Sequence, residues 1–430
     1  MLIPGIISSL IFFGCLYLIF TEKVNRSIVA MVGAALMVIL GLVFNFYTED
    51  QAVLTLDVNT LGLLLGMMIL VSLLEPTGFF QFVAVWVARF SKGNPVRLLI
   101  LLGAVTTIIS MFLNNVTTVV LIAPVTILIC EILGINPQVF LMSEALLSNT
   151  GGLATLVGDP PNVLIGSAAN LSFLDFLSHT FPVVIVVWFV ALAILRYLFR
   201  TDLNKIPDNT EAIEQLNPDE VFEDRKSALK ILIVIMGTIV LFLFGDVLNI
   251  RPALIALSGA AAAMMWIQPN IQETLKRIDW DVLLFFASLF IMVGGMEQAG
   301  VMHALANLIG AAKDLPIMVI GLAMMWVVAL LSAIIDNVPI TIALIPVVLD
   351  LATTGINPLP LWWALAIGAG LGGNGTIIGS TANVIVASLS ERTRNPITSA
   401  IWNKSGFPIM LATCAVASVM YIILFPLMSR

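Results

Sequence analysis

The sequence predicts an all-α polytopic membrane protein with two inverted repeats, each holding five spanning helices, one of them unwound, and one re-entrant hairpin. Hydrophobic residues make up 60% of the 430 residues and charged residues only 10%, whereas soluble domains carry roughly 25% charged residues. The mean hydropathy is +1.08. Apolar runs of about twenty residues, the length that spans a bilayer, recur along the chain. The second half repeats motifs of the first. Most of the surface must therefore face lipid.

Repeat 1, at residues 1–200, should begin with spans at Leu2 to Phe20, Ser27 to Phe46 and Leu61 to Leu74. The first run is longer than the apolar part of a signal peptide, lacks an A-x-A cleavage site and is followed by its basic residues, so we interpret it as a retained span. Two half-length apolar runs then meet at a polar tip in the hairpin Leu98 to Leu133.

Repeat 1 should end with a span interrupted by glycines, Val139 to Ile165, and a last span, Phe181 to Tyr197. An acidic cytoplasmic linker at residues 201–226 supplies much of the net charge of −7, and repeat 2 follows at residues 227–430. No basic patch suggests nucleic acid. The three cysteines are widely separated, so they form neither a disulfide framework nor a CxxC metal site.

The internal repeat keeps one register over several motifs. EPTG at Glu75 recurs as EQAG at Glu297. NNV at Asn114 recurs as DNV at Asp336, the same number of residues further along the chain. After a single deletion, two further motifs stay in register: GINP, at Gly134 and Gly355, and GLATLVGDPPNV at Gly152, which aligns without gaps to GNGTIIGSTANV at Gly373. Repeats of this kind often locate a binding site in transporters.

Membrane orientation follows from the odd number of crossings in each repeat, which requires repeat 2 to be inverted. Basic residues collect on the cytoplasmic side of membrane proteins. With both termini outside, all of the 19 basic residues except Arg251, Lys313 and Arg430 fall inside. We therefore expect a multi-pass protein of the cell inner membrane with both termini outside.

The hairpin tips are the first candidate site. Irregular backbone at membrane depth survives only where it lines a polar cavity. The tips combine amide, hydroxyl and carboxylate groups that could replace the hydration shell of an ion or a small hydroxylated solute. A capped turn or interhelical hydrogen bonding is the alternative interpretation. The residues are Asn114, Asn115, Thr117 and Thr118 at one tip, and Asp336, Asn337 and Thr341 at the other.

The interrupted span is the second candidate. Ser148 to Asn162 contains three glycines, two successive prolines and a carboxylate, so it cannot be one continuous helix. Its partner, Gly372 to Asn383, has Ser380 where repeat 1 has Asp159. A plain proline kink would explain neither the acid nor the repeated glycines and asparagines.

Three carboxylates are predicted at membrane depth: Glu144, Asp159 and Asp336. An ionised, unpaired carboxylate there costs about 2.5–3.5 kcal/mol on insertion scales. No basic residue is near them in sequence, so protonation or a bound cation would remove the cost. We expect them to couple transport to protons.

The segments NNVTTVVLIAPVTI, SEALLSNTGGLATLVGDPPNVLIGSA and IIDNVPITIALIPV resemble the arsenite/antimonite efflux permease and melanosomal P-protein family of the ion transporter superfamily. The resemblance covers nearly the whole chain and implies a scaffold that carries two opposed hairpins and two unwound helices, with elevator-like or rocking movement. The usual Asp-Asn of the first tip is Asn114–Asn115 here. Carried onto this chain, the family's site comprises Asn114, Asn115, Asn149, Thr150, Gly151, Gly152, Thr155, Asp159, Asn162, Asp336, Asn337, Asn374, Gly375, Thr376, Ser380 and Asn383.

The expected solute is a neutral metalloid hydroxide, because Asp159 and Asp336 would repel a multiply charged anion and amides can both donate and accept hydrogen bonds. The function expected is efflux of arsenite or antimonite by proton antiport. The alternatives are Na+/H+ antiport and Na+-coupled uptake of a carboxylate or inorganic anion. HExxH and GxSxG motifs are absent from the sequence, which favours a transporter over an intramembrane enzyme. We expect no cofactor and no metal site, with protons, or Na+ as the alternative, as coupling ions. A homodimer and a soluble ATPase partner stay open.

Overall fold

The computed structural model describes residues 2–20, 24–205, 207, 218–301, 315–353 and 355–429. In these ranges the chain is helical and has no strand, which confirms the all-α prediction. Seven of the described helices are long and apolar enough to cross a membrane. Lys313, Arg430 and the linker residues 206 and 208–217 lie outside the described residues.

The helices of repeat 1 follow the predicted order. They are α1 (Leu2–Phe20), α2 (Arg26–Val43), α3 (Glu49–Leu54), α4 (Val58–Leu74), η1 (Glu75–Thr77), α5 (Phe79–Ser91), α6 (Pro95–Ser110), α7 (Asn115–Leu133), α8 (Gln138–Gly152), α9 (Pro160–Ala169), α10 (Phe173–Leu198) and α11 (Arg200–Leu203).

The described helices of repeat 2 follow the same order, and residues 302–314, which include nearly all of the segment equivalent to α5, lie outside the described residues. The linker holds the short helix η2 (Pro218–Val221). Repeat 2 consists of α13 (Arg225–Leu248), α14 (Pro252–Ile267), α15 (Ile271–Lys276), α16 (Trp280–Gln298), α18 (Ile317–Ser332), α19 (Asn337–Thr353), α20 (Leu359–Gly372), η4 (Ile377–Gly379), α21 (Thr381–Ser390), α22 (Ser399–Ile423) and α23 (Phe425–Met428).

Three details correct the sequence prediction. Helix α5 was not predicted. Helix α10 begins at Phe173 rather than Phe181, because Ser172 and Asp175 form a capping box ahead of the apolar run. The hairpin arms are not half-length, since α7 has 19 residues, or about 28 Å at 1.5 Å per residue.

Each hairpin tip is also a helix start. Asn114 Oδ1 accepts a hydrogen bond from the backbone N–H of Thr117 at 2.7 Å, which caps α7. Asp336 Oδ1 accepts from the backbone N–H of Val338 at 3.1 Å at the start of α19. The capped-turn interpretation therefore holds for these two side chains, and it leaves the next residue of each tip, Asn115 and Asn337, free for other contacts.

The internal repeat extends to the helix boundaries. Helices α6 and α18 begin and end at positions that match in the register of the sequence motifs, and so do α9 and α21. Packing between the repeats is reciprocal: α4 lies against α14 and α16 against α2, while α7 lies against α21 and α19 against α9. Reciprocal contacts are those of a two-fold axis. Positions that match in this register are called equivalent below.

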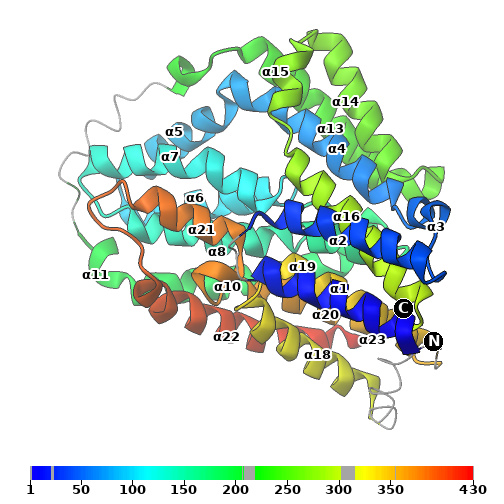
Figure 1. Cartoon of the computed structure of the whole chain (residues 1–430). Coiled ribbons are helices and arrows are strands. Elements are labelled where there is room, and N and C mark those ends of the chain that lie inside the picture. The colour runs from blue at the N-terminus through cyan, green and yellow to red at the C-terminus, as the bar shows by residue number, and fades with distance from the viewer. Residues whose placement is uncertain are drawn as a thin grey trace.

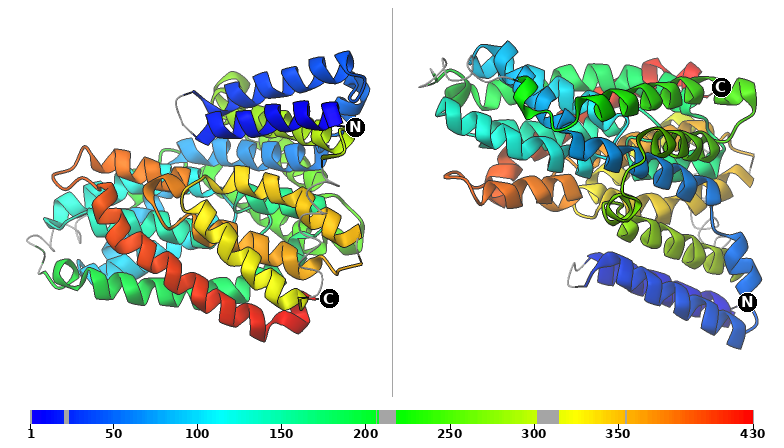
Figure 2. Two further views of the ribbon diagram at one scale, coloured as in Figure 1. Left: turned by 60° about the horizontal axis from the view of Figure 1, so that its bottom comes forward. Right: turned by 90° about the horizontal axis from the view of Figure 1, so that it is seen from above.

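The termini lie at one end of the molecule (Figure 1), and we call this end the terminal face. Both views in Figure 2 show α1 and α2 at the edge of the molecule. Termini at one end agree with an equal, odd number of crossings in each repeat. Inversion across a membrane stays a prediction.

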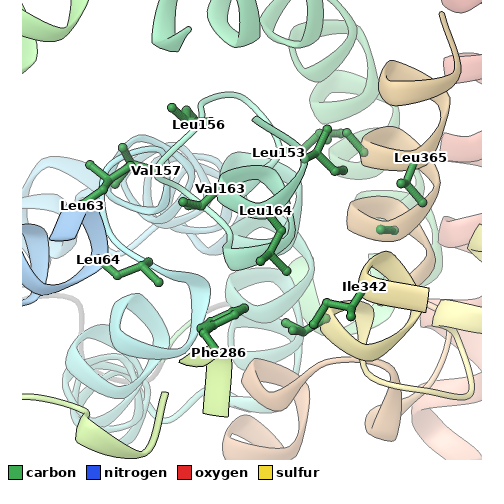
Figure 3. Packing of buried hydrophobic residues seen from close by; sticks show 14 of the residues in the cluster. Leu63, Leu64, Leu153, Leu156, Val157, Val163, Leu164, Phe286, Ile342 and Leu365 are labelled. Carbon is green, nitrogen blue, oxygen red and sulfur yellow. The ribbon is translucent and has the colours of Figure 1, made fainter. Parts of the chain in front are cut away.

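We call α8 and α9, with the unwound stretch between them, the first broken helix, and α20 and α21 the second. An apolar layer joins α4 to the first. Leu63 and Leu64 of α4 approach Leu156, Val157 and Val163, as Figure 3 shows. All five side chains are buried in one hydrophobic cluster. At about 1.5–3 kcal/mol for each large side chain buried, this layer holds α4 and α9 together.

The orientation can be tested with Lys92→Cys, between α5 and α6, and Arg251→Cys, at the start of α14. A membrane-impermeant thiol reagent added outside intact cells should label Arg251→Cys but not Lys92→Cys, and only access from the cytoplasmic side should label Lys92→Cys. The orientation that leaves most basic residues in the cytoplasm places these two on opposite sides. Labelling of both from one side would contradict the inverted arrangement.

Candidate functional site

A cavity of about 220 Å³ lies where both hairpin tips and both broken helices meet the starts of α2 and α16. We call it the central cavity. Six predicted site residues line it: Asn114, Asn115, Asp159, Asp336, Asn337 and Ser380. The sequence did not predict the other polar wall residues, Arg26, Asp279, Asp281 and Thr381, or the apolar Phe285 and Phe286.

Two asparagines close the helix breaks. Asn162 Nδ2 donates to the carbonyl oxygens of Gly152 at 2.9 Å and Thr155 at 2.8 Å. At the equivalent position, Asn383 Nδ2 donates to the carbonyls of Gly373 at 2.8 Å and Thr376 at 2.9 Å. These carbonyls have lost their helical partners at the break. The NH2 groups of both asparagines therefore hold the unwound backbone.

Asn149 connects the two halves of the site. Its Oδ1 accepts from Asn115 Nδ2 at 2.8 Å and Ser380 Oγ at 2.9 Å. Its Nδ2 donates to Asn374 Oδ1 at 2.9 Å and Asn383 Oδ1 at 3.1 Å. The amide thus uses both donors and both lone pairs. One buried side chain fixes the first hairpin tip relative to the second broken helix.

Asp159 is joined to the opposite hairpin. It is 2% exposed, and its Oδ2 accepts from Asn337 Nδ2 at 2.9 Å. Ser380 replaces it at the equivalent position and donates to Asn149 instead. One half of the central cavity therefore carries a buried acid and the other a hydroxyl group.

Asp336 has a basic partner, which the sequence did not reveal. Arg26 Nη1 lies 3.2 Å from Asp336 Oδ2 and 3.4 Å from Thr381 Oγ1. The two residues are 310 positions apart in the chain. The expectation of an unpaired carboxylate is wrong for Asp336, because α2 brings a guanidinium to the second hairpin tip.

Several predicted residues lie away from the cavity wall. Thr155 and Thr376 donate to the hairpin carbonyls of Met111 and Ala333. Other hydroxyl groups bond within their own helices: Thr150 to Leu146 O and Thr341 to Asn337 O. Thr117 lines a neighbouring cavity, and Thr118 Oγ1 is buried with no partner among the described residues. The glycines Gly151, Gly152 and Gly375 allow close packing, because a Cβ on any of them would come within 3 Å of a neighbouring atom.

Glu144 is buried on α8 and accepts from the Thr126 hydroxyl group. Its Oε2 has no partner among the described residues, and it does not line the central cavity. The equivalent positions in repeat 2 hold the buried apolar pair Val348 and Leu365. The fold therefore accepts an apolar pair here, so packing alone does not require the acid.

Asp279 lies at the mouth of the central cavity, just before α16. Partial desolvation by the surrounding protein and the neighbouring Asp281 charge raise the pKa of its carboxyl, and Arg26 offsets part of the rise. The sequence carried a signal for this residue, because Asp57 stands at the equivalent position of repeat 1. No comparable signal marks Arg26.

A second, larger cavity of about 510 Å³ lies toward the starts of α4, α10 and α14. We call it the terminal vestibule. Its polar residues include Asp57, Asn59, Ser167, Asn170 and Arg251. Leu63, Leu156 and Val163 form its apolar wall, whereas Leu64 and Val157 line a third cavity, of about 270 Å³, beside the first hairpin tip. The apolar layer thus lies between the vestibule and this third cavity.

Broken helices, opposed hairpin tips and a polar cavity between them define a multi-pass membrane transporter of small solutes, not an enzyme. The chain belongs to the citrate transporter family (CitMHS), whose profile matches residues 16–368.

An uncharacterized transporter of Mycobacterium tuberculosis is 38% identical over 421 residues, covering 96% of this chain and 97% of the relative. The P protein of Mus musculus is 31% identical over 488 residues, covering 94% of this chain and 58% of that protein. The YdaH transporter of Alcanivorax borkumensis superimposes with a TM-score of 0.62 over 99% of this chain and 98% of its own, at 16% identity, and thereby shows the fold. The predicted P-protein relationship is confirmed, and the arsenite-permease relationship stays a prediction.

The role of Asn149 can be measured by thermal unfolding in detergent. Asn149→Ala leaves four buried polar groups short of a partner, at about 1–3 kcal/mol for each group that stays unsatisfied. We expect it to lower the unfolding temperature by much more than Thr413→Val, which removes a buried hydroxyl group that bonds only its own helix. Equal shifts for the two variants would show that Asn149 does not join the halves.

Proposed function

We propose that this chain is a secondary transporter that exports arsenite or antimonite, as neutral hydroxides, in exchange for protons. The carrying observation is the central cavity, whose wall combines amide and hydroxyl groups with four aspartates and one arginine. Neutral trihydroxides both donate and accept hydrogen bonds, as Asn115, Asn337 and Ser380 do.

The charge balance of the wall supports a solute without net negative charge. Asp159, Asp279, Asp281 and Asp336 are opposed by Arg26 alone among the described lining residues. Charges of one sign around a low-dielectric cleft repel solutes of the same sign. A multiply charged anion would enter this cavity only together with cations.

Asp159 is the better candidate for the coupling proton. Asp336 is paired with Arg26 at 3.2 Å, whereas Asp159 is more deeply buried and receives its hydrogen bond from the uncharged Asn337. A proton on Asp159 removes a buried charge when no solute cation replaces it. We retain Asp336 as an electrostatic partner and Glu144 as a second proton carrier.

A carboxylate carried with cations is the second candidate function. Two observations favour it: the guanidinium of Arg26 on the cavity wall, which suits a carboxylate, and the citrate transporter family to which the chain belongs. The aspartates would then hold the accompanying cations. Na+/H+ antiport would use the same aspartates without Arg26.

Flux in everted membrane vesicles separates these functions. An acid-inside pH gradient should drive arsenite uptake by the wild-type protein. Asp159→Asn should still bind arsenite, because the amide keeps hydrogen-bonding groups in a similar volume, but should lose the response to the gradient. Asp202→Asn, away from the cavity on α11, is the matched control and should respond like the wild type.

Three outcomes would contradict the proposal. Arsenite flux at the wild-type rate in Asp159→Asn would remove its coupling role. Citrate flux that requires Arg26, lost in Arg26→Gln, with no arsenite flux, would favour the carboxylate function. Sodium binding that disappears in Asp159→Asn, with no arsenite binding in either protein, would favour Na+/H+ antiport.

Glu144 can be tested by giving repeat 1 the pair that repeat 2 already carries. The double variant Thr126→Val with Glu144→Leu should fold, because Val348 and Leu365 occupy the equivalent positions. If Glu144 carries a proton, pH-driven flux should fall while solute binding stays unchanged. Unchanged flux would assign the pair to packing alone.

A further inference from the structure

The first broken helix and its equivalent in repeat 2 differ in what covers them. Val157 is 5% exposed, whereas the equivalent Ile378 is 48% exposed. Val163 on α9 is 2% exposed, whereas the equivalent Val384 on α21 is 37% exposed. One apolar face is covered in repeat 1 and open in repeat 2.

The cover in repeat 1 is α4, through the apolar layer of Leu63 and Leu64 (Figure 3). The equivalent side chains in repeat 2 are Phe285 and Phe286 of α16. They line the central cavity, and Thr381, the first residue of α21, lines it too. In repeat 2, α16 and the start of α21 both line the central cavity of about 220 Å³ and pack less closely than α4 and α9 do in repeat 1.

A polar contact follows the same asymmetry. The Asp57 carboxylate at the start of α4 accepts from the hydroxyl group of Ser167 on α9. The equivalent residues, Asp279 and Ser388, are both exposed, and no hydrogen bond joins them in the part of the chain that the structure describes. Burial and hydrogen bonding thus agree that one of two equivalent interfaces is closed and the other open.

We propose that the Ile378, Val384 and Ser388 face of α21 is the docking surface for α16 of the same chain in the opposite-facing state. There Phe285 and Phe286 cover the two apolar side chains, and Asp279 accepts from Ser388. The α4–α9 interface and its Asp57–Ser167 contact open at the same time. The inference rests on the proposed transport function but not on the identity of the solute.

The reason for this occupant, rather than lipid, is the two-fold relation of the repeats. Packing between the repeats is reciprocal at the interfaces described above. The α4–α9 contact shows the geometry that an equivalent α16–α21 contact would have. The two broken helices carry apolar side chains at equivalent positions, since Val157 corresponds to Ile378 and Val163 to Val384. Two states of similar energy, which small differential binding can interconvert, are what a transporter needs.

Cysteine cross-linking in membranes tests the surface. The background replaces the three buried native cysteines, Cys15, Cys130 and Cys414, with alanine. A short bifunctional thiol reagent should join Asp57→Cys to Ser167→Cys rapidly, which also shows that the chain is folded. It should join Asp279→Cys to Ser388→Cys within one chain more slowly, as the second state is visited.

The Asp57–Ser167 contact supplies a matched comparison. Ser167→Ala removes a hydrogen bond to a carboxylate that exists only in the closed interface, so it should speed cross-linking of the Asp279/Ser388 cysteine pair by about tenfold. Ser178→Ala, which removes an exposed hydroxyl group on α10 that does not contact Asp57, should leave the rate unchanged.

Each contrary outcome overturns the proposal. Failure of the Asp279/Ser388 pair to cross-link would leave the α21 face to lipid, and cross-links only between chains, seen as dimers, would assign it to a second copy. These readouts need no solute. Cross-linking as expected without arsenite flux would therefore refute the proposed solute while the docking surface stands, and pH-driven arsenite flux without cross-linking would do the reverse.

Discussion

The structure depends on one constraint: carbonyl groups freed where a helix breaks inside an apolar interior must find donors, because each unsatisfied group costs several kcal/mol in lipid. Asn162 and Asn383 satisfy them from beyond each break. Hairpin and break also satisfy each other, since Ser110 Oγ donates to Ser148 O and Ser332 Oγ to Ala369 O. Meeting this constraint places the hairpin tips against the unwound segments and so creates the polar centre.

Once the backbone is satisfied, the differences between the repeats determine the chemistry. Asn149 and Asn374 are joined by a hydrogen bond. Their equivalents, Gly370 and Leu153, lie side by side, and a Cβ added to Gly370 would be 3.4 Å from the Cβ of Leu153. Asp159 likewise has a serine, Ser380, as its equivalent in repeat 2. Common features of the repeats thus build the frame, and the asymmetric polar residues make the two halves of the central cavity chemically different.

The sequence predicted most of the fold because the repeat is local information: motifs at a fixed spacing mark hairpin tips, breaks and spans. It predicted both tips and Asp159 on the cavity wall. It could not predict the Arg26–Asp336 pair, because the two residues are far apart in the sequence and meet only through the packing of α2 against α16. Nor could it separate Asn115 from Asn162, because only geometry shows which amide serves the backbone and which faces the cavity.

The Arg26–Asp336 pair links the charge of the site to the proposed movement. Arg26 belongs to α2, which packs with α16, whereas Asp336 and Thr381 belong to the second tip and to α21. The arginine therefore occupies the gap that must close when α21 docks on α16. Both partners are partly exposed, at 35% and 21% of the side chain, and such pairs contribute only about 0–1 kcal/mol. An interaction this weak adds little to the free energy of the open arrangement, so it does not prevent the proposed docking of α21 on α16.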